Sequence, residues 1–187
     1  GEDLSRKTIL VWGEQGIGDE ILYASILADL IKKDVTVLCE TEERLVSLFQ
    51  RSMPTVSFFS RKDPPHKELK SSLIDFQIPM GNLGRWLRYE DKCFLTERAF
   101  LKPDQKKKQI LRQKYKKPKM IVVGLTWHST NKETGPQKSL KLQDLQLLFD
   151  ISGVYFVDLQ YGVTEDERTS FFNKSGHQIF RLQRCKK

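Results

Sequence analysis

The sequence predicts an α/β fold made of two Rossmann-like units, each with a parallel sheet. Short apolar runs alternate with stretches of helical periodicity from residue 8 to residue 78, and the alternation starts again at residue 120. Each half opens with a strand that ends in a tryptophan, Trp12 or Trp127, followed by a polar or glycine-bearing loop. Strands joined through helices pair in parallel, so both loops should lie at the carboxyl edges of their sheets.

Each element is predicted from the spacing of its apolar residues and from the residues that bound it. The long helix after the first strand ends in Lys32 and Lys33, which suit the negative end of the helix dipole. Thr41 stands where a helix cap is expected, and Pro79 ends the last strand of the first half. The predicted strands are 8–12, 35–39, 56–59, 73–78, 120–127, 154–159 and 178–182, with 35–39 and 120–127 buried, and the predicted helices are 20–33, 42–50, 85–88, 105–115, 142–149 and 165–173.

The net charge of the chain is concentrated in one segment. The 187 residues carry a formal net charge of +8, and segment 102–119, with nine Lys or Arg and one Asp, holds all of this excess. A nucleic-acid site would combine a basic face with interleaved aromatic residues, and this segment offers only Tyr115. We therefore predict an exposed basic linker between domains at 1–101 and 120–187, attraction to an acidic lipid surface or an anionic acceptor being the alternative.

The composition is typical of a folded cytoplasmic protein. Hydrophobic residues make up 39% and charged residues 30% of the chain, which favours a packed core over disorder. No apolar run reaches the roughly 18 residues that a membrane helix needs, and the acidic start lacks the features of a signal peptide. Cys39, Cys93 and Cys185 show no metal or redox spacing, so we expect reduced thiols without a function.

The turn over residues 13–19 is the strongest candidate for a site. Glycine permits positive φ angles and the close approach of a ligand, and the following helix aims its free N–H groups at the turn. Phosphates and other anions favour such a position. The spacing of Gly13, Gly16 and Gly18 matches neither the dinucleotide fingerprint nor a P-loop. From chemistry alone we expect Asp19 at the N-cap or one residue inside it, with a plain capping role.

Several sequence blocks occur together in a recognisable order. The first is WGEQGIGDE at 12–20, and the second combines GLTW at 124–127, KSL at 138–140 and FVDLQYG at 156–162. With DFQIPMGNL at 75–83, these blocks resemble the heptosyltransferase-like GT-B glycosyltransferases, especially the glycosyltransferase domains joined to tetratricopeptide repeats in bacteria. The resemblance extends over nearly the whole chain.

This resemblance implies a GT-B-like fold, with an N-terminal acceptor domain, a C-terminal nucleotide-sugar domain and a cleft between them. It implies inverting transfer without a metal or other cofactor, in which Asp19 takes the place of the family's general base and faces the cleft. The implied partners are a nucleotide-sugar donor, a sugar or protein acceptor and the tetratricopeptide repeats of a parent protein, with no nucleic acid and no stable membrane insertion. The residues implied to bind substrate or nucleotide are Gly16, Gly18, Trp127, Ser129, Thr130, Lys138 and Gln160.

The sequence departs from the family near its end. The family's second domain carries a later Asp-Thr-x-x-x-His-Leu-Ala-type segment that grips the donor, and His66, His128 and His177 all lack that context. We therefore expect an incomplete second unit, in a fragment or in a short and inactive gene product, and the start at Gly1 favours an incomplete or processed chain. Two other functions stay open: a non-catalytic binding module that lacks the donor half, and an unrelated nucleotide-binding enzyme.

Overall fold

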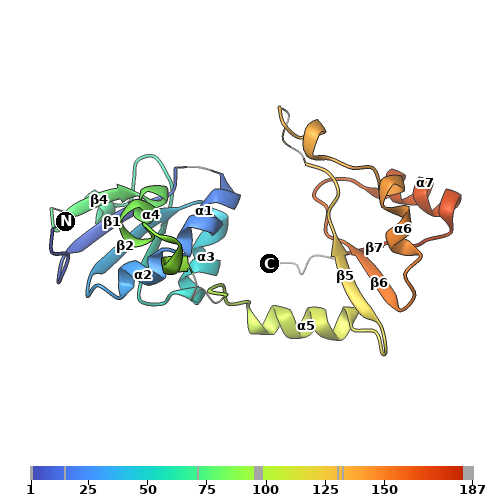
Figure 1. Cartoon of the computed structure of the whole chain (residues 1–187), viewed down its shortest axis with the longest axis horizontal. Helices are drawn as coiled ribbons and strands as arrows, with labels where there is room; N and C mark the ends of the chain where they lie inside the picture. Colours follow the sequence, from blue (N-terminus) through green and yellow to red (C-terminus); the bar gives the residue numbers. More distant parts are fainter. Residues whose placement is uncertain are drawn as a thin grey trace. The chain divides into compact units, whose positions relative to one another are not determined.

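The computed structural model describes residues 2–14, 16–70, 72–94, 99–129, 131 and 133–182. The chain divides into two compact units, Gly1–Gln105 and Lys106–Lys187, each with its own parallel sheet and its own hydrophobic core (Figure 1). The predicted α/β class with a parallel sheet in each half is confirmed.

Sheet A of the first unit has the strand order β3-β2-β1-β4, and each neighbouring pair is parallel. The chain adds strands on one side of β1 and then crosses to its other side, where Trp12 lies opposite Pro79. Ligand sites of open α/β sheets form at the carboxyl edge beside such a switch point, and the turn after Trp12 lies there. The strands are β1 (Thr8–Trp12), β2 (Thr36–Thr41), β3 (Ser57–Ser60) and β4 (Phe76–Pro79).

The prediction of a single helix over 20–33 is wrong, because the chain forms two helices that separate at Ser25 and Ile26. The guanidinium of Arg88 donates to both the hydroxyl and the carbonyl oxygen of Ser25, each at 2.9 Å. The N–H of Asp29, which a continuous helix would pair with that carbonyl, bonds to Ile26 instead. The helices of this unit are α1 (Ile17–Ala24), α2 (Leu27–Ile31), α3 (Glu43–Ser52) and α4 (Leu83–Leu87), with short 3₁₀ turns η1 (Lys67–Lys70), η2 (Met80–Asn82) and η3 (Asp91–Phe94).

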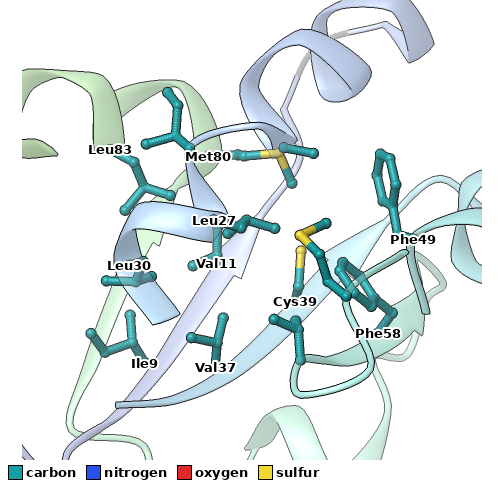
Figure 2. Close-up of a cluster of buried hydrophobic side chains, with 14 of the residues drawn as sticks. Ile9, Val11, Leu27, Leu30, Val37, Cys39, Phe49, Phe58, Met80 and Leu83 are labelled. Atoms are coloured by element: carbon teal, nitrogen blue, oxygen red, sulfur yellow. The ribbon is translucent and has the colours of Figure 1, made fainter. Parts of the chain in front are cut away.

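The core of the first unit is built from alternate residues of β1 and β2 and from the helices that pack against them. Strand β2 is therefore buried at every second residue and not along its whole length, as we had expected for 35–39. Burial raises the pKa of the Cys39 thiol, so this thiol behaves as an apolar core group. Figure 2 shows the cluster, with Ile9, Val11, Leu27, Leu30, Val37, Cys39, Phe49, Phe58, Met80 and Leu83 labelled.

The second unit contains sheet B, with the strand order β5-β6-β7 and parallel pairing throughout. Its core cluster centres on Trp127, Phe149 and Phe156, whose last two rings lie 4.5 Å apart between centroids. Its elements are α5 (Gln105–Tyr115), β5 (Ile121–Leu125), η4 (Pro136–Lys138), η5 (Leu142–Leu145), α6 (Gln146–Phe149), β6 (Val154–Asp158), α7 (Glu165–Ser175) and β7 (Phe180–Arg181).

Strand β5 is more exposed than its apolar sequence predicts. Ile121 is 67% and Val122 40% exposed, so the expectation of a buried strand over 120–127 is wrong for these residues. Within the described part of sheet B, β5 is an outer strand, and α6 and α7 pack against one face of the sheet. An apolar groove of about 390 Å³ remains between α5 and the other face.

The basic segment is exposed, as predicted, because it offers few apolar residues to bury. Of residues 102–119 only Tyr115 is buried, and the lysine and arginine residues are all exposed. Helix α5 groups with the second unit, whose boundary lies between Gln105 and Lys106. None of the helices in the described ranges has the length and hydropathy required to cross a membrane.

Candidate functional site

Asp19 lies in the first turn of α1 with its side chain exposed. Gly16 is the N-cap of this helix, so Asp19 is its third residue and makes no capping hydrogen bond. The reading of Asp19 as a cap is therefore wrong. A carboxylate in this position still interacts favourably with the positive end of the helix dipole.

Glu20, the next residue, is buried, with 1% of its surface exposed. Its Oε2 accepts hydrogen bonds from the Thr41 hydroxyl and from the backbone N–H of Glu42, the second at 3.0 Å. Its Oε1 accepts from Nη2 of Arg61 at 2.6 Å, and this nitrogen also donates to the carbonyl oxygen of Gly13. The predicted capping role of Thr41 is wrong, because Glu42 is the N-cap of α3 and the hydroxyl bonds to Glu20.

Gly13 is required by close packing. A Cβ atom at this position would lie 2.4 Å from Cδ of Glu20 and 2.8 Å from Nη2 of Arg61, closer than real Cβ contacts. Gly13, Gly16 and Gly18 do not use the positive φ angles that glycine permits, since none of the three is among the residues with positive φ. The first glycine of the turn therefore makes room for the pair of buried Glu20 and partly exposed Arg61, and does not serve an unusual backbone angle.

Gly16 and Gly18 are exposed, and their neighbours do not require glycine. A Cβ atom on Gly16 would meet Oδ2 of Asp19 at an ordinary 3.6 Å, and a Cβ atom on Gly18 would meet nothing within 4 Å. Glycine inside a helix costs about 1 kcal/mol relative to alanine, which applies to Gly18, whereas Gly16 is the N-cap, where glycine is tolerated well. Two glycines that packing does not explain leave the backbone beside Asp19 open to the close approach of a ligand.

Trp127 and Gln160 together join the ends of β5 and β6. The Oε1 of Gln160 accepts the N–H groups of Trp127 at 2.9 Å and His128 at 3.1 Å, and its Nε2 donates to the His128 carbonyl oxygen at 2.8 Å. The Trp127 indole donates to Oε2 of Glu167 at 2.9 Å. Trp127 and Gln160 are each 4% exposed. The polar side-chain groups of both residues are thus engaged inside the unit.

Asp158, at the end of β6, is fully buried and accepts several charged or polar donors. The Thr164 hydroxyl lies 2.6 Å from its Oδ2, and Nη1 of Arg181 lies 2.8 Å from the same oxygen. Nε of Arg168 lies 3.2 Å away, and the Gln160 N–H donates to Oδ1 at 2.7 Å. Burial alone would raise the pKa of Asp158, but the bonds from Thr164, Arg181 and Gln160 prevail and lower it.

The loop after Trp127 carries the remaining predicted contacts. Ser129 is half-buried, and its N–H donates to Oγ of Ser139 at 3.0 Å. Lys138 is exposed, at the end of the short turn η4, and its N–H bonds to Gly135 at 3.0 Å. Thr130 lies outside the described residues. Ser129 and Lys138 therefore belong to one folded loop, in which the Lys138 side chain is accessible to an anion.

The buried carboxylates Glu20 and Asp158, the partly exposed Arg61 and the half-buried Glu167 were not predicted as site or support residues. A carboxylate directly after Asp19 and an arginine directly after β3 were visible in the sequence, but neither signals burial by itself. Charged residues are rarely buried unless they are paired, and the arginines closest to Glu20 and Asp158 in space lie 41 and 23 residues away in the sequence, respectively. Among the described residues, no group of three or more His, Cys, Asp or Glu side chains could hold a metal ion.

Comparison with known proteins gives one informative similarity. The chain is 31% identical to Protein FlbA of Caulobacter vibrioides over 187 residues, which takes in 89% of this chain. The chain spans 30% of the length of that relative. No family model and no solved structure matches the chain. The name of the relative states no activity, so the function must be argued from the residues themselves.

Proposed function

We propose that the chain is a glycosyltransferase, or part of one, that transfers a sugar from a nucleotide-sugar to an acceptor hydroxyl with inversion. The observation that carries the proposal is the exposed Asp19 in the first turn of α1, beside two glycines that packing does not require. This group lies after the strand at which the order of sheet A changes direction, where ligand sites of such sheets form. The sequence blocks that resemble GT-B enzymes support the reaction class.

In the proposed step, the carboxylate of Asp19 accepts the proton of the acceptor hydroxyl while its oxygen attacks the anomeric carbon of the donor. The new bond joins the acceptor oxygen to that carbon, and the bond from the carbon to the diphosphate oxygen breaks. The electron pair leaves with the nucleoside diphosphate. A carboxylate can serve as the base because the hydroxyl becomes acidic only as the attack proceeds.

The second unit would bind the donor through its loop of residues 128–139. The exposed Lys138 offers a cation, and Ser129 offers a hydroxyl and a backbone in a folded turn. Fixed positive and hydrogen-bonding groups lower the barrier when negative charge grows on the departing diphosphate. Trp127 and Gln160 would support this loop from beneath, since their polar groups bind the backbone and Glu167. A cytoplasmic setting and a parent protein with tetratricopeptide repeats are parts of this proposal.

A non-catalytic binding module is the second candidate. The observation that favours it is that Trp127 and Gln160 make internal hydrogen bonds, which leaves them fewer groups for a donor. Such a module would bind a nucleotide or a sugar and would not break the glycosyl bond. The two candidates differ in turnover, which a single assay measures.

The test uses this chain and the product of the whole reading frame with UDP-glucose, UDP-N-acetylglucosamine and GDP-mannose as donors, and with free sugars and a serine-containing peptide as acceptor hydroxyls. Melting temperature reports binding, since a ligand at about 100 times its Kd stabilises the folded state by about 2.7 kcal/mol. Release of UDP or GDP reports turnover, with Asp19→Asn as the control for the base. Nucleotide release that Asp19→Asn abolishes supports a transferase, and binding without release supports the module. If the proteins show no release and no binding, both candidates are overturned.

A further inference from the structure

We infer that Glu20 is a positioning residue of the proposed active site: its buried carboxylate, paired with Arg61, holds the turn and the first helical turn that carry Asp19. This inference rests on the proposed function. Asp19 and Glu20 are neighbours on α1, and the first is exposed while the second is 1% exposed. The buried acid is therefore the next residue after the candidate base on the same helix.

Burying a carboxylate costs free energy, because the charge loses its hydration, unless the group is paired and hydrogen-bonded inside the protein. Glu20 is fully supplied with partners, from Thr41, Glu42 and Arg61. Among the described residues, no buried side-chain nitrogen or oxygen lacks a partner. An apolar side chain on α1 could fill such a place as stably, so a complete ionic network at this position favours a role in geometry.

The partners of Glu20 come from the carboxyl ends of neighbouring strands. Thr41 is the last residue of β2, and Arg61 directly follows β3. Through the Gly13 carbonyl oxygen, the same Arg61 nitrogen also holds the first residue after β1. One carboxylate and one guanidinium thus connect three strand ends at the edge of the sheet where ligands of such folds bind.

Gly13 provides independent support for this role. Its position leaves no room for a Cβ atom because Cδ of Glu20 and Nη2 of Arg61 would lie 2.4 Å and 2.8 Å from it. The turn therefore packs directly on the ion pair, with no side chain between them. Movement of Glu20 would be transmitted to both ends of the segment that precedes Asp19. Small displacements of a catalytic group reduce rates strongly, by about 100-fold for about 1 Å.

Asp75 provides a matched control on the opposite edge of the same sheet. Its carboxylate accepts the Thr8 backbone N–H at 2.8 Å and the Lys7 ammonium at 3.1 Å, so it also joins a strand through a backbone donor and a cation. It directly precedes β4 and lies at the amino end of β1, away from the proposed site. If replacing Glu20 lowered activity only by destabilising the protein, Asp75→Asn should lower activity as well.

The experiment measures kcat and KM for UDP or GDP release by the whole gene product, with the nucleotide-sugar that the parent turns over fastest. The variants are Glu20→Gln, Arg61→Lys and Asp75→Asn, each studied well below its melting temperature. We expect Glu20→Gln to lower kcat by about 10- to 100-fold with little change in KM, because a misplaced base affects the chemical step more than binding. Asp75→Asn should keep the parental kcat.

Two further measurements separate positioning from stability. The acid limb of the pH profile of kcat should stay in place in Glu20→Gln, because Asp19 remains the base. Arg61→Lys keeps the charge but loses the fork that reaches both Glu20 and Gly13, so its kcat should also fall, and it serves as the test if Glu20→Gln does not fold.

Parental kcat in the folded variants, or equal losses in Glu20→Gln and Asp75→Asn, would overturn the inference while the transferase proposal stands. A parent that turns over none of the nucleotide-sugars would overturn the proposed function, and the role of Glu20 with it.

Discussion

Among the described residues, two carboxylates are buried: Glu20 in the first unit and Asp158 in the second. Both accept hydrogen bonds from the same kinds of donor. Each accepts a threonine hydroxyl, a backbone N–H and an arginine. The difference lies in what they join. Glu20 connects the ends of three strands next to an exposed acid, whereas two partners of Asp158, Gln160 and Thr164, follow it within six residues. The first network therefore supports the sheet edge that carries the candidate site, and the second mainly closes the loop after its own strand.

The largest expected effect is on stability and comes from Asp158→Asn. Breaking a buried ion pair by removing one partner costs about 3–5 kcal/mol, since Arg168 and Arg181 would lose their common carboxylate. Urea unfolding of the parent and the variant measures the difference. A cost below about 1 kcal/mol would contradict the view that this network holds the second unit together.

The lowered pKa of Asp158 also predicts a dependence on pH. The group stabilises the fold fully above about pH 3.9, the pKa of an unfolded aspartate, and this stabilisation is lost as the pH falls towards the lower folded pKa. Asp158→Asn should therefore remove part of the loss of stability below pH 4. Melting curves between pH 2 and pH 7 test this, and identical acid profiles in both proteins would contradict it.

Asp19→Asn should affect activity and not stability, unlike the substitution at Asp158. We expect nucleotide release to fall by about 10²-fold or more, the usual scale for a general base. Asp19→Ala should cost only the dipole interaction, about 0.3–1 kcal/mol, because Gly16 and not Asp19 is the N-cap. Kinetics and melting temperatures of both variants test this, and a parental rate in Asp19→Asn would leave Asp19 without a catalytic role.

Two glycines, one in each unit, should be intolerant of a side chain. A Cβ atom on Gly135 would lie 2.1 Å from the backbone oxygen of Asn131, whereas on Gly13 it would meet the side chains of Glu20 and Arg61. Overpacking costs about 1–3 kcal/mol, and we expect Gly135→Ala to be the worse because backbone atoms yield less than side chains. Unfolding of both variants measures this.

A double-mutant cycle sharpens this comparison. Gly13→Ala should cost less when Glu20 is also replaced by alanine, because the colliding carboxylate is gone. If the stability losses of the two single variants simply add in the double variant, the collision is relieved in another way.

The smallest expected effect is a gain in stability from Gly18→Ala. The added Cβ atom meets nothing within 4 Å, and alanine favours the helix by about 1 kcal/mol relative to glycine. If a ligand approaches the backbone at this position, the same variant should bind nucleotide-sugars or acceptor more weakly. Melting temperature and nucleotide-release kinetics test the two effects separately, and a destabilised variant would contradict the open space around Gly18.

The sequence by itself predicted the class, the two parallel sheets and the exposed basic segment. These features depend on local patterns: apolar runs, helical spacing and the density of lysine in residues 102–119. The same patterns placed the turn after Trp12 at the carboxyl edge of sheet A, since strands joined through helices run parallel. Local spacing failed where a distant group intervened, as at the break between α1 and α2, which Arg88 stabilises across 63 residues of sequence.

Only the tertiary structure decided what the residues around Asp19 do. The sequence shows Gly13, Glu20 and Arg61 as a turn glycine, a helix residue and a loop residue, with no sign that they meet. Thr41 and Arg61 reach Glu20 across 21 and 41 residues of sequence, and local periodicity carries no information about such pairings. The order of the strands in sheet A brings their carboxyl ends together, and burial then requires the carboxylate to find these partners.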